Sequence, residues 1–392
     1  MKIAGKKTGV VKTQRVLGME SWHLASSTVE AFLTKTGGHL APVRFKLGKK
    51  VIEPYAIAPW HSEKLDPSTP TILRVLRGDF FCMPFGGNEK AWEGERHPVH
   101  GQTANDPWTL LSLKRAKRST VGHFRMKTKT RPAVVDKEIF LRDGETVVYQ
   151  RHTIRGGCGP MPMGHHPILS FPEEHGSGII STSKFVLGQV FPGMFEFPDG
   201  AGYQSLQPGS EFKSLKKVQT ATASTTDLTH YPARRGFEDL VMMVADKRLP
   251  FAWTAVTFPR QGYVWFAIRD PKVLRNTILW ISNGGRHYAP WNGRHLCAMG
   301  IEDVTACFHM GLAESAGRNA LTERGYPTAL MLSPDAPTVI NYISGVVAIP
   351  HGFDQVKTIE ASEDQQTLTL TSASGKSVRT PVDVAFLKGA SA

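Results

Sequence analysis

Residues 138–154, EIFLRDGETVVYQRHTI, contain two runs rich in β-branched, aromatic and other apolar residues. Between the runs lies Asp143-Gly144, a dipeptide that favours the tight turn of a β-hairpin. The stretch therefore predicts two antiparallel strands joined by a short connection.

Similar runs recur along most of the chain. We expect further strands at residues 120–129, 183–191, 251–258, 262–269, 276–282, 366–371 and 377–386. The best helical stretch is short, at about residues 311–324. No repeat or natural linker divides the chain, so we expect one all-β domain over residues 1–392, a large antiparallel β-sandwich with few short helices. Residues 1–20 are expected to form a peripheral basic segment.

The composition is that of a folded protein with many turns. Hydrophobic residues make up 41% of the 392 residues, and there are 37 Gly and 26 Pro. No window approaches the roughly 18 apolar residues of a membrane span, and the basic start lacks the apolar core of a secretory signal. The four cysteines form no CxxC pair, which favours reduced thiols and a cytoplasmic protein.

The formal net charge of +13 would attract nucleic acid, an acidic surface or an anionic small substrate. The densest basic cluster is KRAKR at 114–118, and no nucleic-acid-binding motif surrounds it. We expect a solvated basic face, no nucleic-acid or membrane partner, and a monomer or homodimer. An anionic substrate is the second interpretation.

Three polar stretches interrupt the strand pattern, at residues 78–108, 164–171 and 300–308, the last preceded by 284–295. Each places a His or Glu beside an apolar run. Residues on separate strands of a sandwich meet on one face, so these stretches predict a site gathered from strand ends.

The order HPVHGQTANDPW (97–108), GHHP (164–167) and GIE (300–302) resembles the aldose 1-epimerase (mutarotase) family. PFG at 84–86 ahead of PVHG at 98–101 is most similar to the glucose-6-phosphate 1-epimerase branch. The resemblance spans residues 78–308 through few matching residues. It implies a galactose-mutarotase-like β-supersandwich that acts on a small carbohydrate without a cofactor or metal.

By motif position, the resemblance places His100 and His166 as the two site histidines and Glu302 as the catalytic carboxylate. His166 is preferred over His165 because it directly precedes the Pro-apolar-apolar run, although a shift of one residue stays open. Exchanging the anomers of a cyclic aldose requires a base at O1 and an acid at the ring oxygen. We assign Glu302 as base, His166 as acid and His100 as the group that orients the sugar.

Each of these residues also has a structural interpretation. Glu302 could be a salt-bridged carboxylate, His100 a turn residue, and His165-His166 one buried and one exposed strand residue. Further candidates for sugar contact are Asn105, Trp108, Arg74, Arg286 and Tyr288. For these the alternatives are an Asx turn, core packing or surface charge.

The sugar itself stays open. The phosphosugar branch carries an Arg shortly after its His-Gly, where this chain has Gln102, Thr103 and Ala104. The hypothesis of an acidic or otherwise modified sugar rests on the basic net charge alone. Two other classes remain: a polysaccharide lyase or hydrolase on the same fold, which could recruit Tyr203, Tyr288 and Arg286, and a non-catalytic carbohydrate-binding protein.

Overall fold

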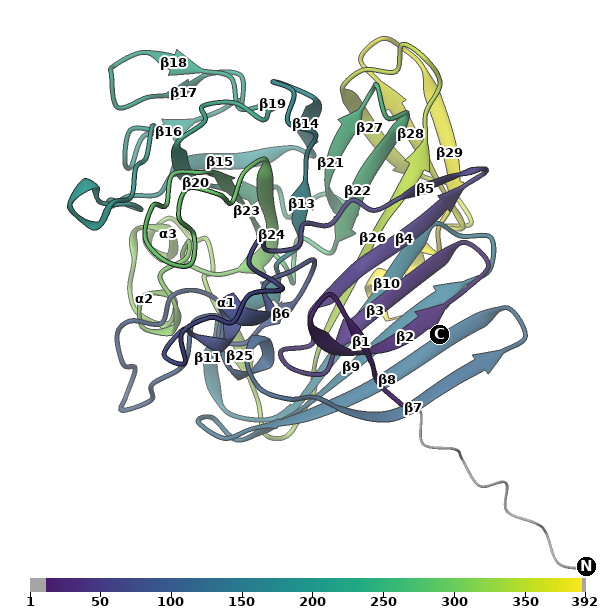
Figure 1. Ribbon diagram of the computed structural model, residues 1–392, viewed down its shortest axis with the longest axis horizontal. Helices are drawn as coiled ribbons and strands as arrows, with labels where there is room; N and C mark the ends of the chain where they lie inside the picture. Colours follow the sequence, from purple (N-terminus) through teal and green to yellow (C-terminus); the bar gives the residue numbers. More distant parts are fainter. Residues whose placement is uncertain (1–11, 390–392) are drawn as a thin grey trace, which may run out of the picture.

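The computed structural model describes residues 12–389, and the named strands among them pair antiparallel (Figure 1). Most of the basic segment expected at residues 1–20 lies outside the described residues. Its described end is part of a sheet, because β1 (Gln14–Val16) pairs with β2 (Met19–Ala25).

Two large sheets form the body of the sandwich. The first has nine strands in the order β19 (His230–Tyr231), β14 (Gly178–Thr182), β21 (Ala252–Phe258), β22 (Tyr263–Arg269), β26 (Thr338–Ala348), β10 (Val147–Gly156), β9 (Ala133–Arg142), β8 (Ser119–Thr128) and β7 (Thr109–Ala116). The second has eight: β16 (Glu211–Phe212), β15 (Phe185–Val190), β20 (Phe237–Ala245), β23 (Asn276–Asn283), β24 (Ala298–Thr305), β12 (Met163–His165), β6 (Phe81–Cys82), and β13 (Ile168–Ser170) on β24.

Smaller sheets and short helices complete the described chain. The five-stranded N-terminal sheet continues from β2 through β3 (Val29–Thr34), β4 (Leu40–Leu47) and β5 (Lys50–Ile52); the three-stranded C-terminal sheet is β27 (Val356–Ala361), β28 (Thr367–Ser372) and β29 (Ser377–Pro381). Two further pairs are β11 (Gly159–Met161) with β25 (Leu330–Leu332) and β17 (Val218–Gln219) with β18 (Thr225–Thr226). The helices are α1 (Thr71–Val75), α2 (Leu312–Ala316), α3 (Ala320–Glu323), η1 (Gln102–Ala104), η2 (Pro198–Gly200) and η3 (Val384–Lys388). None of these helices is long and apolar enough to cross a membrane.

The hairpin predicted from residues 138–154 is confirmed. β9 and β10 pair from Tyr149 opposite Phe140 to Gly156 opposite Ala133, and Asp143 and Gly144 lie in the connection. In the neighbouring β8 each second side chain is buried, from Thr120 to Thr128. The predicted all-β antiparallel fold is therefore observed.

Two predicted elements are wrong in their extent. The helical stretch at 311–324 is two helices, α2 and α3, because Asn319 begins a new helix by accepting hydrogen bonds from the backbone N–H groups of Leu321 and Thr322. The strand expected at 377–386 ends at Pro381, whose ring leaves no N–H for the sheet, and η3 follows.

The eight-stranded sheet buries both of its faces. On β23, Leu279 and Ile281 point into the core between the large sheets, whereas Ile278 and Trp280 point to the opposite face. That outer face is covered by α1, by loops from the first hundred residues and by the segments around 291 and 308. The sheet thus offers a rigid floor, and loops supply the walls of whatever lies on it.

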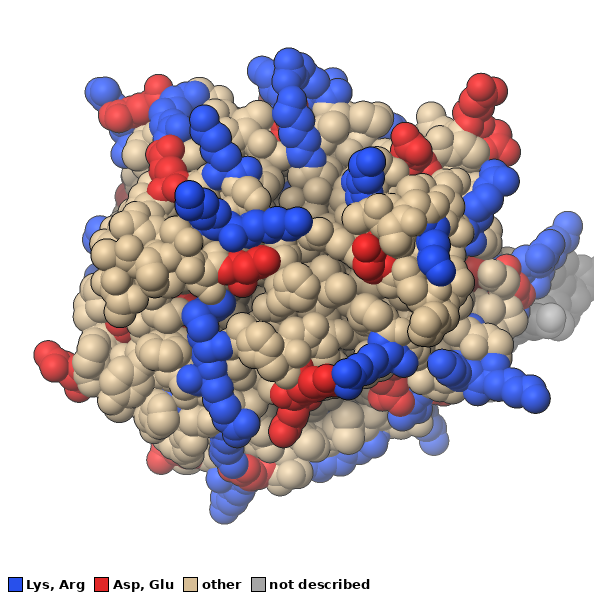
Figure 2. All heavy atoms as spheres, turned by 90° about the horizontal axis from the view of Figure 1, so that it is seen from above, with Lys and Arg blue, Asp and Glu red and all other residues tan. Residues whose placement is uncertain are grey.

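Charged side chains are spread over the molecular surface. On the face in Figure 2, Lys and Arg stand at intervals with Asp and Glu between them. The basic cluster at 114–118 spans the end of β7 and the turn to β8, where Arg115 forms an ion pair with Asp143 at 2.5 Å. The face in Figure 2 thus carries positive and negative charges interspersed, and in the basic cluster one charge is paired.

Gly101 provides a test of how the loop at 97–108 is held. Its φ is +75°, and a β-carbon there would collide with the carbonyl group of Met83. Gly144 has a similar φ of +84° but open space around it. We expect Gly101→Ala to lower the free energy of unfolding by about 1 kcal/mol or more beyond Gly144→Ala, measured by urea denaturation. If both variants lost the same free energy of unfolding, the close contact between Gly101 and Met83 would not restrict the side chain at position 101.

Candidate active site

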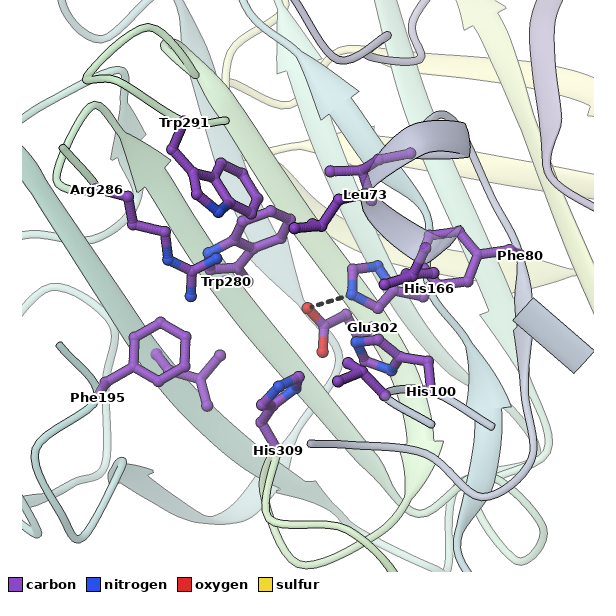
Figure 3. Close-up of a pocket in the computed structure, with 14 residues that line it drawn as sticks. Leu73, Phe80, His100, His166, Phe195, Trp280, Arg286, Trp291, Glu302 and His309 are labelled. Atoms are coloured by element: carbon purple, nitrogen blue, oxygen red, sulfur yellow. Dashed lines mark ion pairs between the residues drawn. The ribbon is translucent and has the colours of Figure 1, made fainter. Parts of the chain in front are cut away.

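A pocket lies on the outer face of the eight-stranded sheet, and its cavity volume is about 90 Å³. The polar side chains that line it come from distant parts of the chain: His100, His166, Arg286, Glu302 and His309. Its walls are mainly apolar, with Leu73, Phe80, Trp280 and Trp291 among them (Figure 3). An outer pocket of about 600 Å³ adjoins it, since both are lined by Phe195, Arg286 and His309.

At the centre of the pocket His166 Nε2 lies 3.2 Å from Glu302 Oε1 (Figure 3). The sheet sets this contact: β12 pairs with β24 with His165 opposite Asp303, and the same register continued by one residue places His166 opposite Glu302. Both side chains are buried, and the second oxygen of Glu302 and the Nδ1 atom of His166 have no hydrogen-bond partner. Unpaired buried polar atoms are costly, which favours a polar ligand at this point.

His100 completes the polar centre from the loop side. Its backbone has a φ of +59°, a region that non-glycine residues rarely adopt and that is often found at functional sites. The backbone N–H of Gly86 donates to His100 Nδ1 at 3.4 Å, which places the proton of the neutral ring on Nε2. The ring stands nearly perpendicular to that of His166, with centroids 4.8 Å apart.

His309 is a pocket residue that sequence reasoning missed. It follows Phe308, the last residue of the polar stretch at 300–308, and its ring centroid is 4.9 Å from that of His100 (Figure 3). The only signal for it in the sequence was its position next to that stretch. A third imidazole therefore faces the same space as the two predicted ones.

Burial favours the uncharged form of every titratable group at this centre. It lowers the pKa of His166 to about 3 and that of His309 to about 4, and it holds the pKa of His100 well below its usual value. Burial also raises the pKa of Glu302 well above its ordinary value. Burial therefore favours the carboxylic acid form of Glu302 and the neutral imidazole form of His166, and their 3.2 Å contact allows a proton to pass between them.

Arg286 is the cation of the pocket. Its Nε donates to Glu196 Oε1 at 2.5 Å, and the guanidinium lies 4.7 Å from the ring centre of Trp291. Burial acts to lower its pKa, but the carboxylates of Glu238 and Glu196 outweigh this and raise it. Glu238 in turn accepts from Trp280 Nε1 at 2.8 Å, so the floor of the pocket is held in place. Arg286 is charged and already paired.

His165 lies behind the pocket rather than in it. Its Nδ1 is 3.0 Å from Asp79 Oδ2, and its ring stacks on Tyr342 at 4.2 Å. Asp303 shares this inner face, accepting from Tyr342 at 3.0 Å and pairing with Arg269 at 2.8 Å. Neighbouring strand residues point to opposite faces, which is why His166 and not His165 enters the pocket.

Three of the predicted sugar contacts do not line the pocket. Asn105 holds the loop together, donating to the carbonyls of Val99 and Gly101 at 2.8 Å each. Trp108 is buried in the core, and Arg74 is exposed and donates to the Thr69 carbonyl at 2.7 Å. Trp108 and Arg74 thus match the alternatives of core packing and surface charge. Asn105 makes no Asx turn, since its Oδ1 accepts from the backbone N–H of Ile72 at 2.9 Å.

Of the remaining candidates, Arg286 lines both pockets and Tyr288 lines only the outer one. Tyr288 is 40% exposed, and its hydroxyl donates to Glu196 Oε2 at 3.3 Å. Tyr203, considered as a lyase base, contacts the His287 ring and lines neither pocket. The loop at 284–295 therefore contributes part of the wall.

Comparison with solved structures identifies the fold. An aldose 1-epimerase candidate from Escherichia coli is similar with a TM-score of 0.56 and 12% identity, over 85% of this chain and 100% of its own. A galactose mutarotase-related enzyme from Lactobacillus acidophilus gives 0.53 and 11%, over 84% and 97%. An aldose 1-epimerase candidate from Klebsiella pneumoniae gives 0.56 and 15%, over 85% and 80%.

No protein-family model and no curated protein matches the sequence. At 11 to 15% identity the structural similarity defines the class of fold, a galactose-mutarotase-like β-sandwich. It does not single out the glucose-6-phosphate 1-epimerase branch.

The buried imidazoles predict a dependence of stability on pH. The pKa of His309 is about 4 in the folded protein and near 6.5 when unfolded, so the unfolded chain binds more protons between these values. The contribution of neutral His309 to the free energy of unfolding is fully present above pH 6.5 and is lost as the pH falls toward 4. We expect His309→Gln to reduce the slope of the unfolding free energy against pH by up to about 1.4 kcal/mol per unit in this range.

Urea denaturation at several pH values between 4 and 7 measures this slope. His175→Gln, at an exposed histidine, serves as the matched control and should keep the wild-type slope. A slope unchanged by His309→Gln would mean that this imidazole is solvated in solution.

Proposed function

We propose that the protein is an aldose 1-epimerase-like isomerase, which exchanges the α and β anomers of a sugar by acid–base ring opening. The observation that carries the proposal is the 3.2 Å contact between His166 Nε2 and Glu302 Oε1 in a buried pocket. In a cyclic aldose, O1 and the ring oxygen are bonded to the same carbon. An acid and a base on neighbouring side chains can therefore reach both atoms of the same sugar.

The roles follow from proton balance. Glu302 removes the proton of the O1 hydroxyl, the bond between C1 and the ring oxygen breaks, and His166 protonates that oxygen. After rotation about the C1–C2 bond, closure on the other face of the aldehyde returns both protons. Burial favours the proton on Glu302, so the reaction requires its transfer across the 3.2 Å contact to give the reactive carboxylate and imidazolium.

His100 and His309 are proposed to hold the sugar. The Nε2–H of neutral His100 can donate to an oxygen that becomes negative during ring opening. The ring of His309 lies against that of His100 and lines the same cavity. The apolar faces of Trp280 and Phe80 suit the C–H face of a sugar ring and keep water from the aldehyde.

The charge of the pocket favours a neutral sugar over an anionic one. Arg286 is its one guanidinium, and its Nε already pairs with the carboxylate of Glu196 at 2.5 Å. An acidic sugar would bring a second negative charge close to Glu196 and to Glu302, which becomes a carboxylate during the reaction. The hypothesis of an acidic sugar rested on the net charge of +13, but of the Lys and Arg residues only Arg286 is among those that line this pocket.

Replacement of the pair tests the proposal. We expect Glu302→Gln to lower the rate of anomer exchange about a hundredfold or more, and His166→Ala to lower it by a similar factor, because each removes a proton-transfer group. Exchange is measured by NMR on a panel of neutral, uronic and phosphorylated aldoses. Glu360→Gln, at an exposed strand position, should keep the wild-type rate.

The same panel separates the other classes. If both variants exchange a sugar as fast as the wild-type protein, the proposed mechanism is wrong. Binding with no accelerated exchange of any sugar would support a carbohydrate-binding protein. A product that absorbs ultraviolet light, formed from a polyuronate, would instead indicate a lyase.

A further inference from the structure

The outer pocket is much larger than one sugar ring requires. Its volume of about 600 Å³ lies within the range of ligand sites, and it shares Phe195, Arg286 and His309 with the inner pocket. A ligand held at Glu302 can therefore continue into the outer pocket without a break. The proposed isomerisation does not use this space.

The charged groups of the outer pocket are largely balanced among themselves. Arg286 pairs with Glu196 at 2.5 Å, and Lys90 pairs with Glu314 at 3.0 Å. Glu89 adds one more carboxylate to the lining. The lining thus carries three carboxylates against two cations, which disfavours an anionic ligand and offers acceptors for hydroxyl groups.

Exposed apolar side chains gather at this pocket. Phe197 is 58% exposed, Met194 42% and Tyr288 40%, and all three line it. Phe197 directly precedes η2, and Tyr288 belongs to the loop at 284–295. Large apolar groups that water reaches and polar groups surround are typical of a binding surface. Aromatic rings between hydroxyl acceptors suit the alternating apolar and polar faces of sugars.

We infer that the outer pocket is a subsite for a neutral saccharide chain whose reducing-end ring occupies the inner pocket. The inference rests on the proposed function for the placement of the reducing end. It specifies the substrate class as an uncharged oligosaccharide, bound by Phe197, Met194 and Tyr288 through the units that follow the reacting ring.

Equilibrium binding to matched sugars tests the subsite. The probes are glucose with cellotriose, galactose with β-1,4-galactotriose, mannose with β-1,4-mannotriose, and galacturonic acid with its trimer, each titrated into the full chain by calorimetry. At least one neutral trisaccharide should bind about tenfold or more tightly than its monosaccharide. Phe197→Ala should reduce that ratio about tenfold, because stacking on the second unit is lost.

Met331→Ala is the matched control, since Met331 is 68% exposed on β25 and lines neither pocket. It should keep the wild-type ratio. The subsite would be overturned if no neutral trisaccharide bound more tightly than its monosaccharide, or if Phe197→Ala left this gain in affinity intact. A larger gain in affinity for the acidic trimer would also overturn it. Because binding does not require turnover, a trisaccharide gain without anomer exchange would sustain the subsite and contradict the proposed function.

Discussion

The antiparallel register between β12 and β24 is the constraint on which the candidate site depends. Because His165 lies opposite Asp303, the next residue, His166, lies opposite Glu302. Gly164 permits the close approach of the two strands, since a β-carbon at this position would collide with the Asp303 carbonyl. A shift of one residue would exchange the two faces of β12. The acid–histidine pair is thus a property of the sheet, and loops need only cover it.

The inner face of the same strands carries a second polar group, and this has an energetic consequence. Asp79, His165, Asp303 and Arg269 are all buried between the sheets. Each makes at least one ion pair or hydrogen bond, which offsets the cost of removing charge from water. Buried polar networks accept few alternative arrangements, so the inner network restrains the strands that hold His166 and Glu302.

Sequence reasoning predicted what local pattern determines. The hairpin at 138–154 was predictable because residue type and turn chemistry act over a few residues. The placement of His100, His166 and Glu302 in one pocket was expected from motif order. Asn105 and Trp108 do not line the pocket, and the sequence could not show this, because an amide or indole that satisfies a loop looks the same in a sequence as one that faces a ligand.

His309 escaped prediction for a related reason. It lies beyond the end of β24, and the chain brings it to His100 through a turn whose path no periodicity specifies. The division of one helical stretch into α2 and α3 depended on a capping side chain, Asn319, which competes locally with helix continuation. The failures thus concern loops and ends, where tertiary contacts outweigh local preference.

The Arg286–Glu196 ion pair joins two loops that are far apart in the sequence, and neither loop carries the central acid–histidine pair. Gly202 also forms a backbone bridge to Arg286, so the two loops form one wall. Insertions or substitutions in this wall can alter the length and shape of an accepted ligand while the sheet beneath stays unchanged. Related chains could therefore diverge in specificity by exchanging surface loops, with the reactive centre inherited intact.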